Sequence, residues 1–130
     1  MSPFIHLLFS KMEDNYIINT TISYYQLSNK YINKILSLPD EDPLLSDLVD
    51  YKNVPLNLCC PISLELIRDP IKTSDGFTYD RKSLELYFES CCNRNTIACS
   101  PLTRASFTSF ERNYDLREDI KEFIKEQESL

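Results

Sequence analysis

Gly76 is the single glycine among 130 residues, so it marks the one place where the sequence supplies a backbone that accepts a positive φ angle at no steric cost. It ends a Ser-Asp-Gly triplet between two runs prone to form strands, residues 71–73 and 77–79. Asp-Gly between such runs is a strong hairpin signal, because the tight turn demands positive φ, which glycine accepts and aspartate tolerates. The sequence therefore predicts a β-hairpin with Gly76 as its structural turn residue.

The predicted hairpin runs directly into a helix, for which Asp80 is the candidate N-cap. Apolar residues at i, i+3, i+4 and i+7 give this helix one apolar face. These residues are Leu84, Tyr87, Phe88 and Cys91. A second helix is expected after Asn113, with a stripe of Leu116, Ile120, Phe123 and Ile124. Residues 99–110 show no clear period and predict a loop with a short extended piece, and no internal repeat is visible.

Residues 38–55 contain three prolines and a group of acids that interrupt any long helical pattern, which places a boundary at about Val54. Before it, apolar residues at helical spacing predict a helix over residues 28–38, stopped by Pro39. This stripe consists of Ile18, Ile22, Tyr25, Ile32 and Leu36. A strand remains the alternative for residues 16–25, because β-branched and aromatic residues are frequent there. We expect a partly helical extension (1–53), a compact domain (54–126) and a short tail (127–130).

The charge and hydropathy of the chain exclude two classes of partner. A net charge of -6 opposes phosphate backbones and anionic membrane surfaces, so we expect neither nucleic acid nor membrane binding. No window approaches the run of about 18 apolar residues that a membrane span requires. The first eleven residues have neither a basic leader nor a small-residue cleavage site. The expected location is therefore intracellular, in the cytoplasm or the nucleus.

Five cysteines, an odd number, suit a reducing compartment better than a disulfide scaffold. Four of them form the adjacent pairs 59–60 and 91–92, which cannot both turn easily toward one ion, whereas zinc sites prefer Cys-x-x-Cys spacing. The only histidine, His6, lies inside an apolar run far from the cysteines, which favours packing over catalysis. The sequence therefore argues against a metal site, a cofactor and a catalytic cysteine.

Five ordered blocks resemble the U-box, the zinc-free relative of the RING domain of ubiquitin ligases. They are Val54-Pro55 with Leu58, "CPISLELIRDP", "GFTYDR", "SPLTR" and "NYDLR". The resemblance implies a compact α+β fold of hairpin, central helix, loop and C-terminal helix, in which hydrogen bonds and salt bridges hold two neighbouring loops. Candidates for this network are Glu65, Arg68, Asp69, Asp80 and Arg81, whose pairing the sequence leaves open.

The same resemblance implies a partner and a binding surface. U-boxes bind a ubiquitin-conjugating enzyme charged with ubiquitin and hold that conjugate ready for attack by a lysine of a protein substrate, which the sequence does not identify. Ile62 and Leu64 match the apolar contacts from one loop, and Pro101 matches the contact from the other. Tyr87 takes the place of a large residue on the central helix. Arg104 matches the arginine that bridges the conjugating enzyme and ubiquitin.

Other interpretations stay open beside this one. The apolar candidates could belong to the core, and Arg104 could be a solvated surface charge. Ser100 stands where relatives have Cys or Asp, and Arg112 stands where they have Pro. The leading hypothesis is a U-box ubiquitin-protein ligase, and the alternative is a degenerate U-box that only binds proteins. Residues 1–53 are expected to serve target binding or self-association, and a homodimer with Leu86 at the contact is a further hypothesis.

Overall fold

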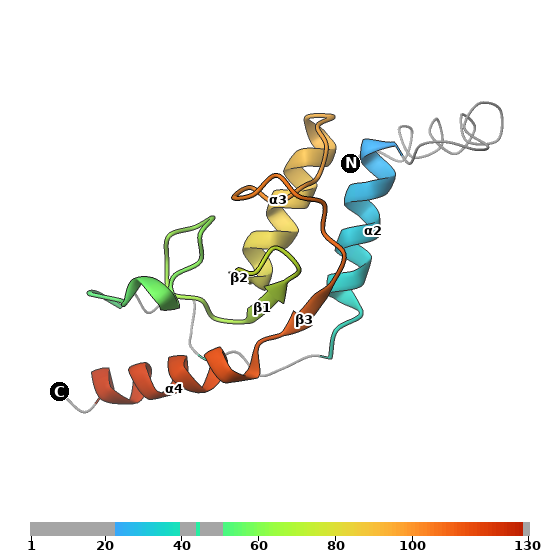
Figure 1. The fold of residues 1–130 in the computed structure, drawn as a ribbon. Helices are drawn as coiled ribbons and strands as arrows, with labels where there is room; N and C mark the ends of the chain where they lie inside the picture. The colour runs from blue at the N-terminus through green and yellow to red at the C-terminus, as the bar shows by residue number, and fades with distance from the viewer. Residues whose placement is uncertain (1–22, 40–43, 45–50, 129–130) are drawn as a thin grey trace.

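The computed structural model describes residues 23–39, 44 and 51–128 (Figure 1). The elements are α2 (Tyr24–Leu36), the 3-10 turn η1 (Leu56–Leu58), β1 (Pro70–Thr73), β2 (Thr78–Asp80), α3 (Arg81–Asn93), β3 (Phe110–Arg112) and α4 (Tyr114–Glu128). The strands form one antiparallel sheet in the order β2-β1-β3. The predicted α+β class with a hairpin, a central helix and a C-terminal helix is confirmed. Within the described residues, no helix is long and apolar enough to cross a membrane.

The hairpin turns where the sequence predicts it. Gly76 has a φ of 90°, its N–H donates to the Thr73 carbonyl at 3.1 Å, and the Thr73 N–H donates to the Phe77 carbonyl at 3.0 Å. Nothing lies within 4 Å of the position that a Cβ at Gly76 would occupy, so the backbone angle alone favours glycine there. Asp75 does not take the positive φ that the sequence allowed for it. Its carboxylate instead accepts the Phe77 N–H at 2.9 Å.

Asp80 lies at the N-cap position of helix α3, as the sequence predicts. Asp80 makes no side-chain hydrogen bond to its own helix. One of its carboxylate oxygens, Oδ1, accepts the N–H groups of Arg68 and Asp69, each at 3.0 Å. The acid that looks like a local cap therefore joins α3 to the loop before β1.

Helix α4 has the cap that α3 lacks. The Asn113 Oδ1 accepts the Leu116 N–H at 3.0 Å, and Asn113 also donates to the Thr78 hydroxyl at 2.8 Å. The predicted stripe is confirmed, since Ile120, Phe123 and Ile124 are buried and Leu116 is half-buried. Asn113 thus anchors the helix to the hairpin as well as starting it.

Helix α2 confirms the helical expectation for the N-terminal segment and shifts its register. Ser23 and Gln26 form a reciprocal capping box, so the helix begins before residue 28 in spite of the β-prone residues there. Leu36, placed on the buried stripe by the sequence, is 57 % exposed, and the buried residues are instead Ser28, Tyr31 and Ile35. Ile18 and Ile22 lie outside the described residues.

The buried face of α2 joins the same core as α3 and the sheet, and Figure 1 shows the two helices side by side. The Tyr31 ring lies 5.2 Å from that of Phe88, 5.7 Å from that of Phe107 and 5.6 Å from that of Phe110. Phe107 and Phe110 follow the loop that leaves α3. This aromatic group joins α2 to α3, to β3 and to the segment just before β3.

Candidate functional site

Two loops in the molecule have the same backbone hydrogen bonds. In the first loop, residues 60–65, the Cys60 N–H donates to the Glu65 carbonyl and the Leu64 N–H donates to the Cys60 carbonyl, both at 2.8 Å. In the second loop, residues 100–105, the Ser100 N–H donates to the Ala105 carbonyl at 2.9 Å and the Arg104 N–H donates to the Ser100 carbonyl at 3.0 Å. The two loops are therefore copies of one six-residue turn.

The match extends to the side chains and to the unusual angle of the fifth residue. Leu64 and Arg104 have φ angles of 62° and 68°, a left-handed conformation that costs non-glycine residues energy. In each loop the hydroxyl of the fourth residue accepts the N–H of the sixth, at 3.3 Å for Ser63 and 3.2 Å for Thr103. The sequence was expected to contain no repeat, yet proline, an apolar residue and a hydroxyl recur in the same order in "CPISLE" and "SPLTRA".

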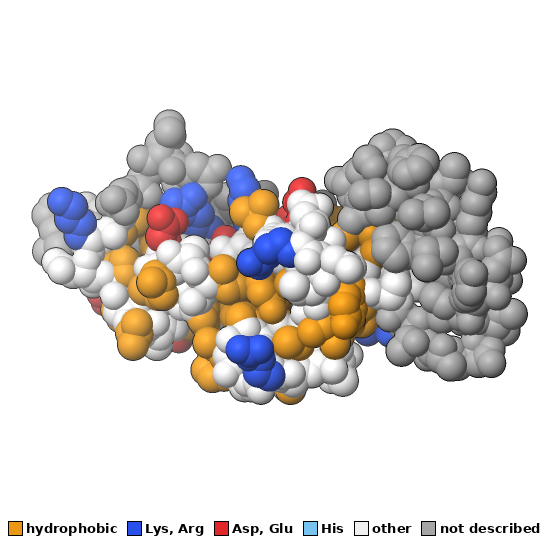
Figure 2. Space-filling view, turned by 90° about the horizontal axis from the view of Figure 1, so that it is seen from above, with side chains coloured by type: hydrophobic (Ala, Val, Ile, Leu, Met, Phe, Trp, Pro, Cys, Tyr) orange, Lys and Arg blue, Asp and Glu red, His pale blue; other side chains and the backbone are white. Residues whose placement is uncertain are grey.

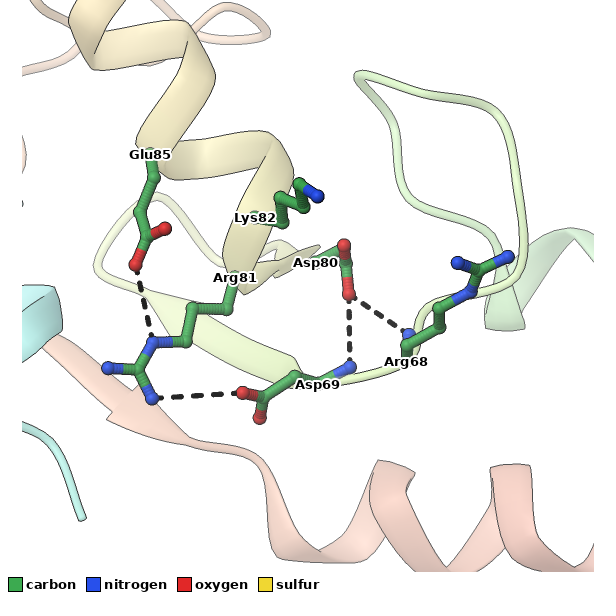
Figure 3. A pocket seen from close by; sticks show the side chains of 6 residues that line it. All are labelled: Arg68, Asp69, Asp80, Arg81, Lys82 and Glu85. Atoms are coloured by element: carbon green, nitrogen blue, oxygen red, sulfur yellow. Dashed lines mark hydrogen bonds and ion pairs between the residues drawn. The ribbon is translucent and has the colours of Figure 1, made fainter. Parts of the chain in front are cut away.

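Asp80 contacts the first loop at Cys60 and the chain just after the loop at two main-chain N–H groups. Asp80 accepts the N–H groups of Arg68 and Asp69, as Figure 3 shows, and its own N–H donates to the Cys60 Sγ at 3.3 Å. Burial raises the pKa of the Asp80 carboxyl, and the two N–H donors oppose that rise. Asp80 therefore connects the start of α3 to Cys60 and to the segment just after the first loop.

Ion pairs lie around Asp80, at a pocket of about 330 Å³. Arg81 pairs with Asp69 at 3.8 Å and with Glu85 at 3.4 Å, and both contacts are drawn in Figure 3. Arg112, nearly buried, pairs with Asp69 from β3. Four of the five network candidates line this pocket, namely Arg68, Asp69, Asp80 and Arg81, and the exposed Glu65 lines a neighbouring pocket together with Arg68 and Asp80. The sequence marks Arg112 only as a departure from the family pattern. Its place in this network was not predicted, because its partners are distant in sequence.

The second loop is held by a side-chain centre at Asp75. The Asp75 Oδ2 accepts the hydroxyls of Tyr79 and Ser100, each at 2.7 Å. Its Oδ1 accepts the Phe77 N–H and the Thr73 hydroxyl. Burial raises the pKa of the Asp75 carboxyl, but these four donors outweigh it and bring the pKa below its ordinary value. The sequence predicts Asp75 only as a turn residue, so its role in holding the second loop was not predicted.

Ser100, which departs from the family pattern, fits the second loop. Its buried hydroxyl donates to Asp75 and accepts the N–H groups of Leu102 at 3.2 Å and Thr103 at 3.0 Å. In this chain the second loop supplies the hydroxyl and the hairpin supplies the carboxylate. The hydrogen-bonding capacity of the serine is filled, so the departure is compensated locally.

The candidate binding residues divide into an exposed and a half-buried group. Leu64 is 74 % exposed, and Pro101 and Arg104 are exposed as well. Ile62 and Tyr87 are half-buried and pack against the core, as the alternative interpretation allowed. The Tyr87 hydroxyl donates to the Cys99 carbonyl at 2.5 Å, and burial raises its pKa, so the hydroxyl stays neutral. Whether these five residues bind a partner stays a prediction.

Between the two loops lies an apolar groove of about 670 Å³, bordered also by the hairpin turn and the start of α4. Its apolar lining includes Leu56, Pro61, Leu64, Phe77, Leu102 and Leu116. Leu64 from the first loop and Leu102 from the second line the same groove, so the loops lie close together. Figure 2, seen from above, shows apolar side chains gathered on one face with Lys and Arg side chains among them.

The next feature is the set of possible metal ligands around the two loops. No group of three or more His, Cys, Asp or Glu side chains that could hold an ion occurs within residues 23–39, 44 and 51–128. All five cysteines are free thiols, and the equivalent first positions of the two loops are Cys60 and Ser100. Hydrogen bonds and ion pairs are the contacts described at these loops.

The chain is similar in sequence to known proteins that contain one domain type. A sequence profile of the U-box domain matches residues 54–129. The chain is 33 % identical over 104 residues to U-box domain-containing protein 21 of Arabidopsis thaliana, which covers 78 % of this chain and 22 % of that protein. It is 40 % identical over 72 residues to U-box domain-containing protein 25 of Arabidopsis thaliana, covering 54 % of this chain and 16 % of the relative. It is 31 % identical over 88 residues to U-box domain-containing protein 57 of Oryza sativa subsp. japonica, covering 66 % and 16 %. The chain thus spans no more than 22 % of the length of these relatives.

Proposed function

The chain belongs to the U-box family, and from this premise we propose that it is a ubiquitin-protein ligase that recruits a conjugating enzyme charged with ubiquitin and promotes ubiquitin transfer to a substrate lysine. The observation that carries the proposal is the pair of matched loops, which present exposed apolar side chains and Arg104 on neighbouring turns. Exposed apolar groups gathered in this way favour a protein partner. The five free cysteines fit action inside the cell, in the cytoplasm or the nucleus.

The reaction needs no nucleophile from this chain. The substrate lysine attacks the thioester carbon of the charged conjugating enzyme, an amide bond forms, the C–S bond breaks, and the cysteine of the conjugating enzyme leaves as the thiol after proton transfer from the amine. The proposed contribution of the ligase is to confine ubiquitin to geometries in which this attack succeeds. That role needs a docking surface and a group that touches both partners.

We assign the docking surface to Ile62, Leu64, Tyr87 and Pro101, and the bridging role to Arg104. The guanidinium has five donors in a planar fork, which can satisfy acceptors on the conjugating enzyme and on ubiquitin together. No side-chain partner of Arg104 occurs among the described residues, so its donors are available for this contact. The strained φ of 68° at Arg104 is consistent with a residue kept for function, since strain gathers at such positions.

The test follows discharge of ubiquitin from a panel of charged conjugating enzymes to free lysine, with the full chain as the ligase. We expect acceleration by the unchanged protein. Arg104→Ala should slow the discharge while the affinity for the conjugating enzyme stays nearly unchanged. Arg94→Ala, which removes another exposed arginine at the end of α3, is the matched control and should discharge normally. Equal loss of discharge and binding in Arg104→Ala would refute the bridging role.

The binding surface has its own variant. Ile62→Ala should weaken binding of the conjugating enzyme by ~2 kcal/mol or more, because truncating a central contact residue has this cost. Ile62 is half-buried, so the unfolding midpoint of the variant has to be measured beside its affinity. Unchanged affinity would remove Ile62 from the interface. A folded chain that binds conjugating enzymes but accelerates discharge from none of them would support the alternative function, a binding module without ligase activity.

A further inference from the structure

The two loops differ in the backbone that flanks them. Just outside the six-residue turn of the first loop, the Ile67 N–H donates to the Leu58 carbonyl at 2.9 Å, and Cys59 forms an isolated β-bridge with Leu66. The corresponding residues of the second loop are 98, 99, 106 and 107. Within the part of the chain that the structure describes, no backbone hydrogen bond joins residues 98 and 107, and no β-bridge joins residues 99 and 106. The second loop therefore lacks the outer backbone pairing of the first.

At the same place, helix α3 supplies a hydrogen bond from a side chain. The Tyr87 hydroxyl donates to the carbonyl of Cys99, the residue just before the second loop. Tyr87 is half-buried and packs against the core, and its ring centre lies 5.4 Å from that of the fully buried Phe88. The donor therefore comes from a helix that is packed into the core, whereas the acceptor lies in a segment without helix or strand.

The Cys99 carbonyl belongs to the peptide group that closes the turn. This group is planar, and its other polar end is the Ser100 N–H, which donates to the Ala105 carbonyl at 2.9 Å. A hydrogen bond to the carbonyl therefore fixes the direction of the N–H and polarises it as a donor. The Ser100 carbonyl in turn accepts the Arg104 N–H at 3.0 Å. Both backbone hydrogen bonds of the turn are thus made by Ser100, directly after the carbonyl that Tyr87 holds.

We infer that the Tyr87 hydroxyl is a positioning group for Arg104, because it holds the peptide group between Cys99 and Ser100 from which the second loop is closed. This role is separate from the docking contact proposed for the Tyr87 side chain. Loss of the hydroxyl should leave the ring packed and loosen the turn that carries Arg104. The consequence for ubiquitin discharge rests on the proposed function, whereas the consequence for the order of the loop does not.

The test uses Tyr87→Phe in the full chain, since phenylalanine keeps the ring and removes only the hydroxyl. Amide hydrogen exchange reads out the second loop through the N–H groups of Ser100 and Arg104, and the first loop through those of Cys60 and Leu64. We expect exchange in the second loop to rise about fivefold, the factor that one net hydrogen bond corresponds to, with the first loop unchanged. Tyr24→Phe, the same change at a 44 % exposed position of α2, is the matched control and should alter neither loop.

Two results would overturn the inference. Unchanged exchange in the second loop would show that the hydroxyl positions nothing, and an equal rise in both loops would show a general loss of stability. In the discharge assay, Tyr87→Phe should slow ubiquitin transfer by a larger factor than it weakens binding of the conjugating enzyme, because the ring is kept and the turn at Arg104 is loosened. If the unchanged protein discharges no conjugating enzyme, the proposed function fails, and the exchange measurement still decides the role of the Tyr87 hydroxyl.

Discussion

The first and second loops share one backbone and differ in what holds them. Beside the first loop the support is a carboxylate oxygen of Asp80 that accepts the main-chain N–H groups of Arg68 and Asp69, just after the loop. In the second loop the support is Asp75, whose two oxygens accept side-chain hydroxyls as well as an N–H group. The six-residue turn is therefore compatible with two kinds of support, which shows that the turn geometry and the tie to the rest of the domain are separate features.

The loops also differ in the residue that they place at the strained fifth position. The first loop has Leu64 there and the second has Arg104, with φ angles only 6° apart at 62° and 68°. A common backbone thus presents an apolar side chain at one site and a cation at the other. This difference matches the proposed division between docking by the first loop and bridging by the second.

The largest loss of stability is expected for Asp75→Asn, which removes part of the support of the second loop. The amide keeps one acceptor oxygen but puts an NH₂ group opposite the hydroxyls of Tyr79 and Ser100, which then lose their acceptor. Two buried hydroxyls left without an acceptor should lower the free energy of unfolding by about 2–4 kcal/mol. Urea unfolding measures this loss. A change below about 0.5 kcal/mol would show that Asp75 does not hold the second loop.

The effect of Asp75 should depend on pH. The pKa of Asp75 is lowered in the folded protein, so its contribution is present above the unfolded pKa of about 3.9 and is lost as the pH falls through the folded pKa. The difference in unfolding free energy between the unchanged protein and Asp75→Asn should therefore shrink below about pH 4. Urea unfolding from pH 7 to pH 3 tests this, and a constant difference would contradict the ionised Asp75.

Gly76→Val should break the turn that presents Asp75. A β-branched residue at a φ of 90° is strained, which we expect to cost about 1–3 kcal/mol. Since no atom lies within 4 Å of the new Cβ, crowding adds little, and Gly76→Asn should cost less because asparagine tolerates positive φ. Thermal unfolding compares the two. Equal losses would show that the cost does not arise from the backbone angle.

Asp80→Asn tests the support beside the first loop. Only the Oδ1 oxygen of Asp80 accepts the two N–H groups, and an asparagine oxygen can do the same. Burial raises the pKa of Asp80, so a neutral amide also avoids the burial of a charge. We expect a loss below about 1 kcal/mol in urea unfolding, against a larger loss for Asp80→Ala. If Asp80→Asn were as destabilising as Asp75→Asn, the proposed difference between the two supports would be wrong.

The smallest change in stability is expected for glycine at the fifth position of each loop. Leu64→Gly and Arg104→Gly relieve the left-handed strain but make the unfolded chain more flexible, so the unfolding free energy should change by less than about 1 kcal/mol. Function should separate the two variants, with Leu64→Gly weakening binding of the conjugating enzyme and Arg104→Gly slowing discharge. Affinity and discharge measurements side by side would expose an identical effect, which would contradict the division of roles.

Local signals in the sequence determined the secondary structure closely. The turn at Gly76, the helix after Asp80 and the stripe of α4 depend on residues within a few positions of one another, and each was found. The five ordered blocks also determined the family, since they combine such local patterns along the chain. Even so, the partial repeat of the two loops was not predicted, because only its hydrogen bonds and φ angles make it plain.

Only the tertiary structure decided which groups hold the loops. Asp75 reaches Ser100 across 25 positions, and Asp80 reaches Arg68 across 12, so neither pairing leaves a local pattern in the sequence. For the same reason, the packing of α2 against Phe88 and Phe107 could not be predicted from the spacing of the apolar residues in α2. That spacing wrongly placed Leu36 on the buried face. Local backbone preferences act between neighbours, whereas these contacts depend on how the sheet and helices pack.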